Sequence, residues 1–115
     1  MRRGDIYIAD LEPVKGSEAN KRRPVLIVSN NDSNETVEER GAGMITVIPL
    51  TTNTERVLAF HTFLLAEETG LSADGKAQAE QIRAISTNRL GQFVGSVPKE
   101  RMLEVNAALR LHLSL

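Results

Sequence analysis

The sequence predicts a mainly β fold, with a small, strongly bent antiparallel sheet or partly open barrel followed by one C-terminal helix. Short apolar runs rich in β-branched residues recur between turn-forming residues over the first 97 positions. After Pro98 the apolar residues recur at helical spacing instead. A chain of 115 residues without an internal repeat is the size of one domain, so we expect a single domain over residues 1–115.

The expected strands are short, and turn residues separate them. Alternating apolar residues predict the first strand over about residues 5–10. The continuous run Val25–Ser29 predicts a central strand, and Pro24 is tolerated at its start because a first strand residue need not donate to the ladder. Further strands are predicted over residues 44–48, 57–66 and 93–97, and residues 76–86 alternate loosely.

Helical signals are concentrated at the C-terminus. Apolar residues from Met102 to Leu113 recur at helical spacing, and Pro98 suits a first helical turn, so we expect an amphipathic helix over about residues 98–112. Residues 36–40 favour a single helical turn. Turns or irregular connections are expected over residues 30–34 and 67–75.

The composition excludes several kinds of site. The sequence has no cysteine, which excludes thiol catalysis, disulfides and cysteine-bound metal centres. Its two histidines, His61 and His112, lack metal-ligand spacing, so we expect no metal. His61 is a candidate acid or base, although a structural role is favoured. No apolar run suits a signal peptide or a membrane span of ~20 residues, so we expect a cytoplasmic protein.

Positive charge is concentrated near the N-terminus. The net charge is −1, but residues 1–23 carry six cations against four carboxylates, and three of the cations are the consecutive Lys21, Arg22 and Arg23. A local basic site on a nearly neutral protein suits a small anionic ligand better than a long duplex. A solvated surface of mixed charge is the alternative interpretation.

Arg23 is the most informative cation of this group. Pro24 restricts Arg23 to extended backbone conformations, which gives its side chain a fixed starting point. A guanidinium is a planar donor suited to phosphate, and it stays charged at any working pH. The alternative is an ordinary surface cation at a strand edge.

Small polar residues offer a second set of candidates. Thr51 and Thr52 follow a predicted strand and could present hydroxyl and backbone N–H groups to an anion, although threonine is also a good β-former. Ser17, next to Gly16, has the same two interpretations.

Five blocks of sequence stand out together by their order and spacing. They are Arg3–Leu11, Gly16–Glu18, Lys21–Val25, Ile48–Asn53 and Glu80–Ile85. In this combination the chain resembles the MazF/PemK toxins of bacterial toxin–antitoxin pairs. The resemblance covers nearly the whole chain, including the terminal helix.

The resemblance implies an SH3-like barrel with short helices that forms a homodimer and needs no cofactor. It also implies a metal-independent endoribonuclease that cuts single-stranded RNA at a short sequence. The expected target is mRNA, and rRNA and tRNA are further candidate targets. Attack by the RNA 2′-hydroxyl would leave a 2′,3′-cyclic phosphate and a 5′-hydroxyl, and the cleavage would inhibit translation and growth. The resemblance further implies a cognate MazE-like antitoxin as the partner, with an acidic tail that occupies the RNA groove.

Carried over to this sequence, the family's catalytic arginine is Arg23 and its catalytic threonine is Thr51. Gly16–Glu18 matches the mobile loop that borders the site, and the block with Gln81 and Arg83 is structural or faces RNA. The sequence has few aromatic side chains on which bases could stack, so we expect bases to be selected by hydrogen bonds. The RNA-binding candidates are Gly16, Ser17, Glu18, Asn20, Lys21, Arg22, Thr52, Asn53, Gln81 and Arg83.

Two alternative functions are weighed against RNA cleavage. A CcdB-like gyrase poison shares the fold but depends on a C-terminal Trp-Gly-Ile element, whereas this chain ends in Leu115 and has no tryptophan. A non-catalytic RNA-binding barrel would keep a basic groove but would not need both Arg23 and Thr51.

Overall fold

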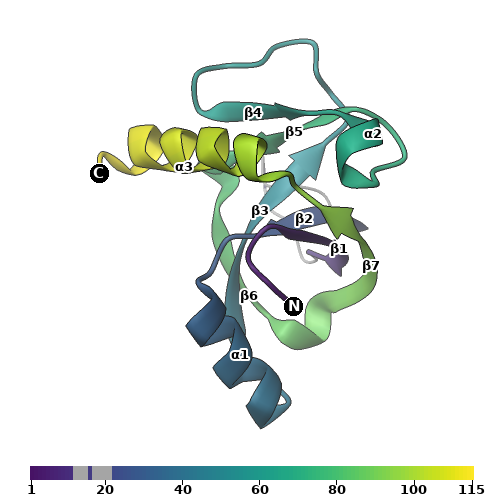
Figure 1. Ribbon diagram of the computed structural model, residues 1–115, viewed down its shortest axis with the longest axis vertical. Coiled ribbons are helices and arrows are strands. Elements are labelled where there is room, and N and C mark those ends of the chain that lie inside the picture. The colour runs from purple at the N-terminus through teal and green to yellow at the C-terminus, as the bar shows by residue number, and fades with distance from the viewer. Residues whose placement is uncertain (12–15, 17–21) are drawn as a thin grey trace.

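The computed structural model describes residues 1–11, 16 and 22–115. In the described residues, seven strands form an antiparallel sheet on which helices pack (Figure 1). The elements are β1 (Asp5–Asp10), β2 (Arg22–Ile27), α1 (Asn31–Arg40), β3 (Met44–Thr51), β4 (His61–Leu64), α2 (Ala66–Thr69), β5 (Gly75–Gln78), η1 (Ala79–Gln81), β6 (Arg83–Ser86), η2 (Thr87–Arg89), β7 (Leu90–Ser96) and α3 (Lys99–Leu113). None of the described helices is long and apolar enough to cross a membrane.

The sheet bends around β3, its longest strand. The strand order is β4-β5-β3-β2-β1-β7, and β6 pairs with β3 outside this path. The first half of β3 pairs with β6, whereas its end, at Leu50 and Thr51, pairs with β5. The described residues show no pairing between the outer strands β4 and β7, so the sheet is open rather than a closed barrel. The prediction of a mainly β, antiparallel fold with a C-terminal helix is confirmed.

Both faces of the sheet carry a hydrophobic core, because successive strand residues point to opposite faces. One core includes Ile48 and Leu64 and contains Val105 of α3. The other includes Val25 and Val47 on the opposite face. Figure 1 shows α3 lying beside β4 and β5, with its C-terminal end extending past the sheet.

The predicted strand over 57–66 is largely wrong. Only His61–Leu64 forms strand β4. The backbone N–H of Leu58 donates to Nδ1 of His61 at 3.0 Å, so this residue is tied to a side chain rather than to a neighbouring strand. On the other side of β4, Ala66–Thr69 forms the short helix α2, where we expected strand and then an irregular connection.

Helix α1 begins at Asn31, five residues before the expected helical turn. Its N-cap is Asn30, whose side chain accepts a hydrogen bond from the backbone N–H of Ser33 at 2.8 Å. The polar run over 30–34 therefore forms the cap and first turn of a helix, because asparagine stabilises caps and turns through the same hydrogen bonds. Helix α3 differs from its expected bounds by one residue at each end.

Strand β2 begins earlier than expected, at Arg22. Pro24 is its third residue and lies opposite Ile8 of β1. Pairing of β2 with β3 starts only at Val25, which leaves the proline outside that ladder. The strand therefore accommodates Pro24 without losing a bond to β3.

Helix α2 packs on β7 through two glycines. A Cβ on Gly95 would lie 1.9 Å from the backbone oxygen of Thr69, and a Cβ on Gly70 would lie 2.7 Å from the oxygen of Val94. Both obstacles are backbone atoms, which cannot move aside as a flexible side chain would. The close approach of α2 to β7 therefore requires glycine at position 95.

Gly95→Ala is expected to lower the free energy of unfolding by about 1–3 kcal/mol, because the added methyl group must displace α2 or β7. Denaturant unfolding followed by circular dichroism measures the change. Gly91→Ala on the same strand is the matched control, since the nearest atom to its Cβ would be the Ile8 oxygen at 3.4 Å. Equal stability of the two variants would contradict this account of the contact.

Candidate functional site

The side chains of Arg23 and Thr51 lie on the same face of the sheet, near the start of β2 and at the end of β3. Strands β2 and β3 are antiparallel, with Val25 opposite Pro49. Continued by two residues, this register places Arg23 opposite Thr51. Directly opposed residues of antiparallel strands point to the same face, with Cβ atoms roughly 5 Å apart.

The guanidinium of Arg23 reaches across to β3. Its Nη1 donates a long hydrogen bond of 3.4 Å to the backbone oxygen of Leu50, the residue before Thr51. The side chain is partly buried, and this burial lowers the pKa of Arg23 from its ordinary value. An arginine still remains protonated at neutral pH, so a fixed positive charge lies beside the end of β3.

The Thr51 hydroxyl is oriented by the turn that follows β3. Its Oγ1 accepts a hydrogen bond from the backbone N–H of Asn53 at 3.2 Å, and the Asn53 side chain accepts one from the N–H of Glu55 at 3.2 Å. A hydroxyl has one proton to donate. The described residues offer no acceptor for that proton, so Thr51 can donate it to a bound anion.

Arg22 is separated from Arg23 by the alternation of strand β2. It lies opposite Asp10, and a Cβ on Gly91 would be 3.8 Å from its guanidinium, which places its side chain toward β7. The two neighbouring arginines therefore face opposite sides of the sheet. Of these two arginines, Arg23 is the one that shares a face with Thr51.

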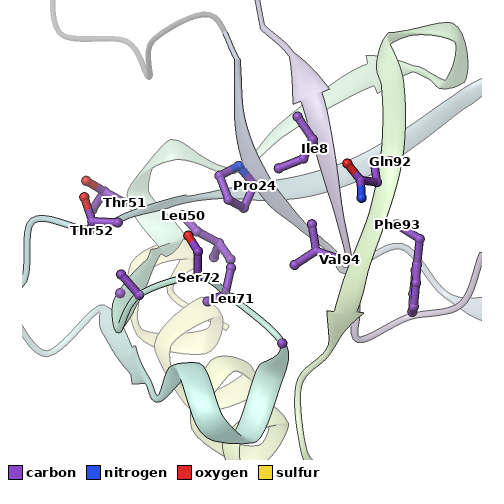
Figure 2. A pocket seen from close by; sticks show the side chains of 13 residues that line it. Ile8, Pro24, Leu50, Thr51, Thr52, Leu71, Ser72, Gln92, Phe93 and Val94 are labelled. Carbon is purple, nitrogen blue, oxygen red and sulfur yellow. The ribbon is translucent and has the colours of Figure 1, made fainter.

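A pocket of about 280 Å³ lies against the face opposite Arg23, between the sheet and the segment after α2. Figure 2 shows Ile8, Leu50 and Val94 of the sheet across from Leu71 and Ser72, with Thr51 and Thr52 together at one end. Its lining is mainly apolar, and Arg23 is not part of it. This pocket is therefore not the place where the two predicted catalytic side chains meet.

Arg83 lies farther along the face that carries Thr51. It is opposite Val47 of β3, four residues before Thr51, which corresponds to roughly 13 Å along the strand. Gln81 belongs to η1, which connects β5 to β6 beside β3. Both residues are partly exposed along β3 rather than adjacent to Arg23.

His61 is held by both of its ring nitrogens. Nδ1 accepts a hydrogen bond from the backbone N–H of Leu58 at 3.0 Å, and Nε2 lies 3.0 Å from Oε2 of Glu80. Nδ1 is thus unprotonated and the ring proton is on Nε2. Strand β5 also separates His61 from Thr51. This arrangement favours the structural interpretation of His61.

The remaining predicted residues belong to the two connections around the site. Thr52 and Asn53 follow Thr51 directly and are exposed. Gly16 is exposed, with a φ of 57° that suits glycine. Ser17, Glu18, Asn20 and Lys21 lie outside the described residues. Among the described residues, no group of three or more carboxylate or imidazole side chains could hold a metal ion.

Sequence reasoning missed Lys76. This residue lies on β5, on the face of the sheet that carries Arg23 and Thr51. It lies on β5 directly opposite Thr51, and only 7% of its surface is exposed. A lysine inside a short alternating segment was the one available signal, but the sequence does not show which face of β5 is buried. Lysine is rarely buried to this degree without a partner.

Comparisons with known proteins agree with the resemblance seen in the sequence. Residues 2–113 match the family described as PemK-like, MazF-like toxin of type II toxin–antitoxin system. The whole chain is 49% identical over 115 residues to Endoribonuclease MazF9 of Mycobacterium tuberculosis and covers 98% of it. It is 34% identical over 116 residues to Endoribonuclease EndoA of Bacillus subtilis, covering 96% of that protein with 100% of this chain.

Solved structures support the same assignment. MazF (Form-I) from Deinococcus radiodurans superimposes with a TM-score of 0.82 at 22% identity, covering 100% of this chain and 97% of that chain, which supports the fold. An endoribonuclease in complex with its cognate antitoxin, from a mycobacterial species, has a TM-score of 0.75 at 28% identity, with 100% of this chain and 96% of that chain covered. Because the family match spans nearly the whole sequence, the chain belongs to the PemK/MazF family of toxins of type II toxin–antitoxin systems.

Proposed function

We propose that this chain, an endoribonuclease by its family, cleaves single-stranded RNA with the scissile phosphate held between Arg23 and Thr51. The observation that carries the proposal is that the Arg23 guanidinium reaches the end of β3, where it donates to the Leu50 oxygen beside Thr51. The register of β2 and β3, continued from Val25 and Pro49, puts this guanidinium and the Thr51 hydroxyl on one face. The relatives named endoribonucleases, at 49% and 34% identity over the whole chain, support the reaction class.

The chemistry needs little from the protein, because RNA carries its own nucleophile. The 2′-oxygen attacks the neighbouring phosphorus, the bond from phosphorus to the 5′-oxygen breaks, and a 2′,3′-cyclic phosphate and a 5′-hydroxyl result. Negative charge grows on the non-bridging oxygens during this step. Arg23 neutralises that charge, and Thr51 donates a hydrogen bond to the same group.

The proton of the 2′-hydroxyl goes to water or to the substrate in this proposal. Arginine is a poor general base because its pKa lies above ~12. His61 is a poor choice as well, since Leu58 and Glu80 already occupy its two ring nitrogens. We therefore assign His61 to holding the connection between β3 and β4. Arg23 stabilises charge and donates a hydrogen bond to the leaving 5′-oxygen, which takes its proton from water.

The partners follow from the family. We propose a cytoplasmic toxin that cuts mRNA at a short sequence, inhibits growth, and is held inactive by a cognate MazE-like antitoxin. The mycobacterial relative that was solved with its cognate antitoxin supports this partner. We also propose a homodimer, as the resemblance implies. The exposed Leu103, Leu111 and Leu113 on α3 offer apolar surface for a second copy.

Cleavage of a long unstructured RNA in excess EDTA tests the proposed function. We expect discrete fragments at an undiminished rate, with 5′-hydroxyl and cyclic phosphate ends, because the described site contains a cation and a hydroxyl but no metal-binding cluster. End-specific labelling and sequencing identify the ends. Intact RNA bound without cleavage would favour a non-catalytic barrel, and intact, unbound RNA with inhibited gyrase would favour a CcdB-like poison.

A further inference from the structure

The Lys76 side chain lies beside the proposed cleavage site in a small cavity. The cavity has a volume of about 210 Å³ and lies under the connection between β3 and β4. Its lining residues are Asn53, Glu55, Arg56, Leu58, His61 and Lys76. Because Lys76 is opposite Thr51, the cavity is one strand away from the proposed scissile phosphate.

Only one hydrogen bond of the Lys76 ammonium is made to the described residues. Its surface is only 7% exposed, and its Nζ donates a hydrogen bond to the backbone oxygen of Arg56. An ammonium carries three N–H donors and no acceptor. The described residues supply no second acceptor to Lys76, and burying a charge without full hydrogen bonding is costly. The cavity therefore suits a ligand that places a hydrogen-bond acceptor against the Lys76 ammonium.

The walls of the cavity suit a planar base better than a phosphate. Leu58 contributes apolar surface, and the ring of His61 is fixed in place by its two hydrogen bonds. Asn53 connects the cavity to the site directly, since its N–H donates to Thr51 while its side chain lies toward Glu55. A nucleotide next to the scissile phosphate can reach this position.

We propose that Lys76 is a specificity residue that selects a keto base, uracil or a 6-oxopurine, at one of the two nucleotides flanking the cut. A keto oxygen accepts a hydrogen bond from the ammonium. At the same position the exocyclic amino group of cytosine or adenine presents donors instead, so the remaining N–H groups of the ammonium gain no acceptor there. This inference rests on the proposed function, because it supposes that RNA is cut beside Thr51.

Substrate variants test the proposal on the unaltered protein. Once the cut site is mapped, short RNAs carry uridine, cytidine, adenosine or inosine at each flanking position in turn. We expect uridine and inosine to be cleaved about 10-fold or more faster than cytidine and adenosine at one position. Inosine is informative because it has the 6-keto oxygen of guanosine without its 2-amino group. Equal rates at both positions would overturn the proposal.

Lys76→Met removes the ammonium while keeping a long apolar stem, and Lys76→Arg keeps the charge. We expect Lys76→Met to reduce the keto preference to about 3-fold or less and Lys76→Arg to retain most of it. Uniform loss of rate for all four bases would mean a structural or phosphate-binding role, and it would overturn the proposal. An unchanged preference would overturn it too, because the base would then be selected without the ammonium.

Thermal unfolding of each variant separates a folding defect from a change in preference. If Lys76→Met does not fold, the wild-type base preference and the Lys76→Arg profile still decide the question. Failure of the wild-type protein to cut any RNA would reject the proposed function itself, together with this inference. Cleavage without a base preference would reject the inference alone.

Discussion

Replacing Arg23 by alanine is expected to reduce RNA cleavage by about 100- to 1000-fold, because one preorganised donor to the developing phosphorane charge is lost. The fold should persist, since the side chain is only partly buried and its 3.4 Å hydrogen bond to the backbone oxygen of Leu50 is long. Single-turnover cleavage of a labelled RNA measures the rate.

Two variants control this experiment. Arg40→Ala, at the exposed end of α1 and away from the site, should leave both cleavage and stability unchanged. Arg23→Lys should recover only part of the activity, because a compact ammonium lacks the planar pair of donors that fits two phosphate oxygens. A folded Arg23→Ala protein with full activity would contradict the assignment.

Thr51→Val is expected to slow cleavage by about 10- to 100-fold, the usual effect of losing one hydrogen bond to a charged group. Valine keeps the shape and the strand preference of threonine but cannot donate. It also removes the acceptor for the Asn53 N–H, so the turn after β3 loses one bond. Cleavage rates at saturating RNA measure the loss.

Thr51→Ser is the matched control for this change. Serine restores both the donor and the acceptor, so we expect it to return most of the activity. If Thr51→Ser were as slow as Thr51→Val, the methyl group rather than the hydroxyl would matter. That outcome would contradict the role assigned to Thr51.

Much of the fold could be predicted from periodicity. The strands near residues 5–10 and 44–48 and the terminal helix are strongly patterned, and the structure contains each of them. The early start of α1 was missed because a run of asparagines stabilises both turns and helix caps. The strand expected over 57–66 was shortened because the Leu58 backbone bonds to the His61 side chain, a contact that no local pattern reveals.

The candidate site could be predicted only in part. Pro24 and the family resemblance pointed to Arg23, and the structure places it across from Thr51, although their catalytic roles stay a prediction. The separation of Arg22 from Arg23, and the burial of Lys76, depend on which face of each strand meets the core. The pairing register of β2, β3 and β5 decides which side chains face the core, and the local sequence of each strand does not reveal this register.

A crystal structure with a short RNA that carries a 2′-deoxy sugar at the mapped cut site would show directly where the scissile phosphate binds. We expect the scissile phosphate to lie between the Arg23 guanidinium and the Thr51 hydroxyl, within hydrogen-bond distance of both. A phosphate bound on the opposite face of the sheet, in the apolar pocket lined by Leu50 and Leu71, would contradict it.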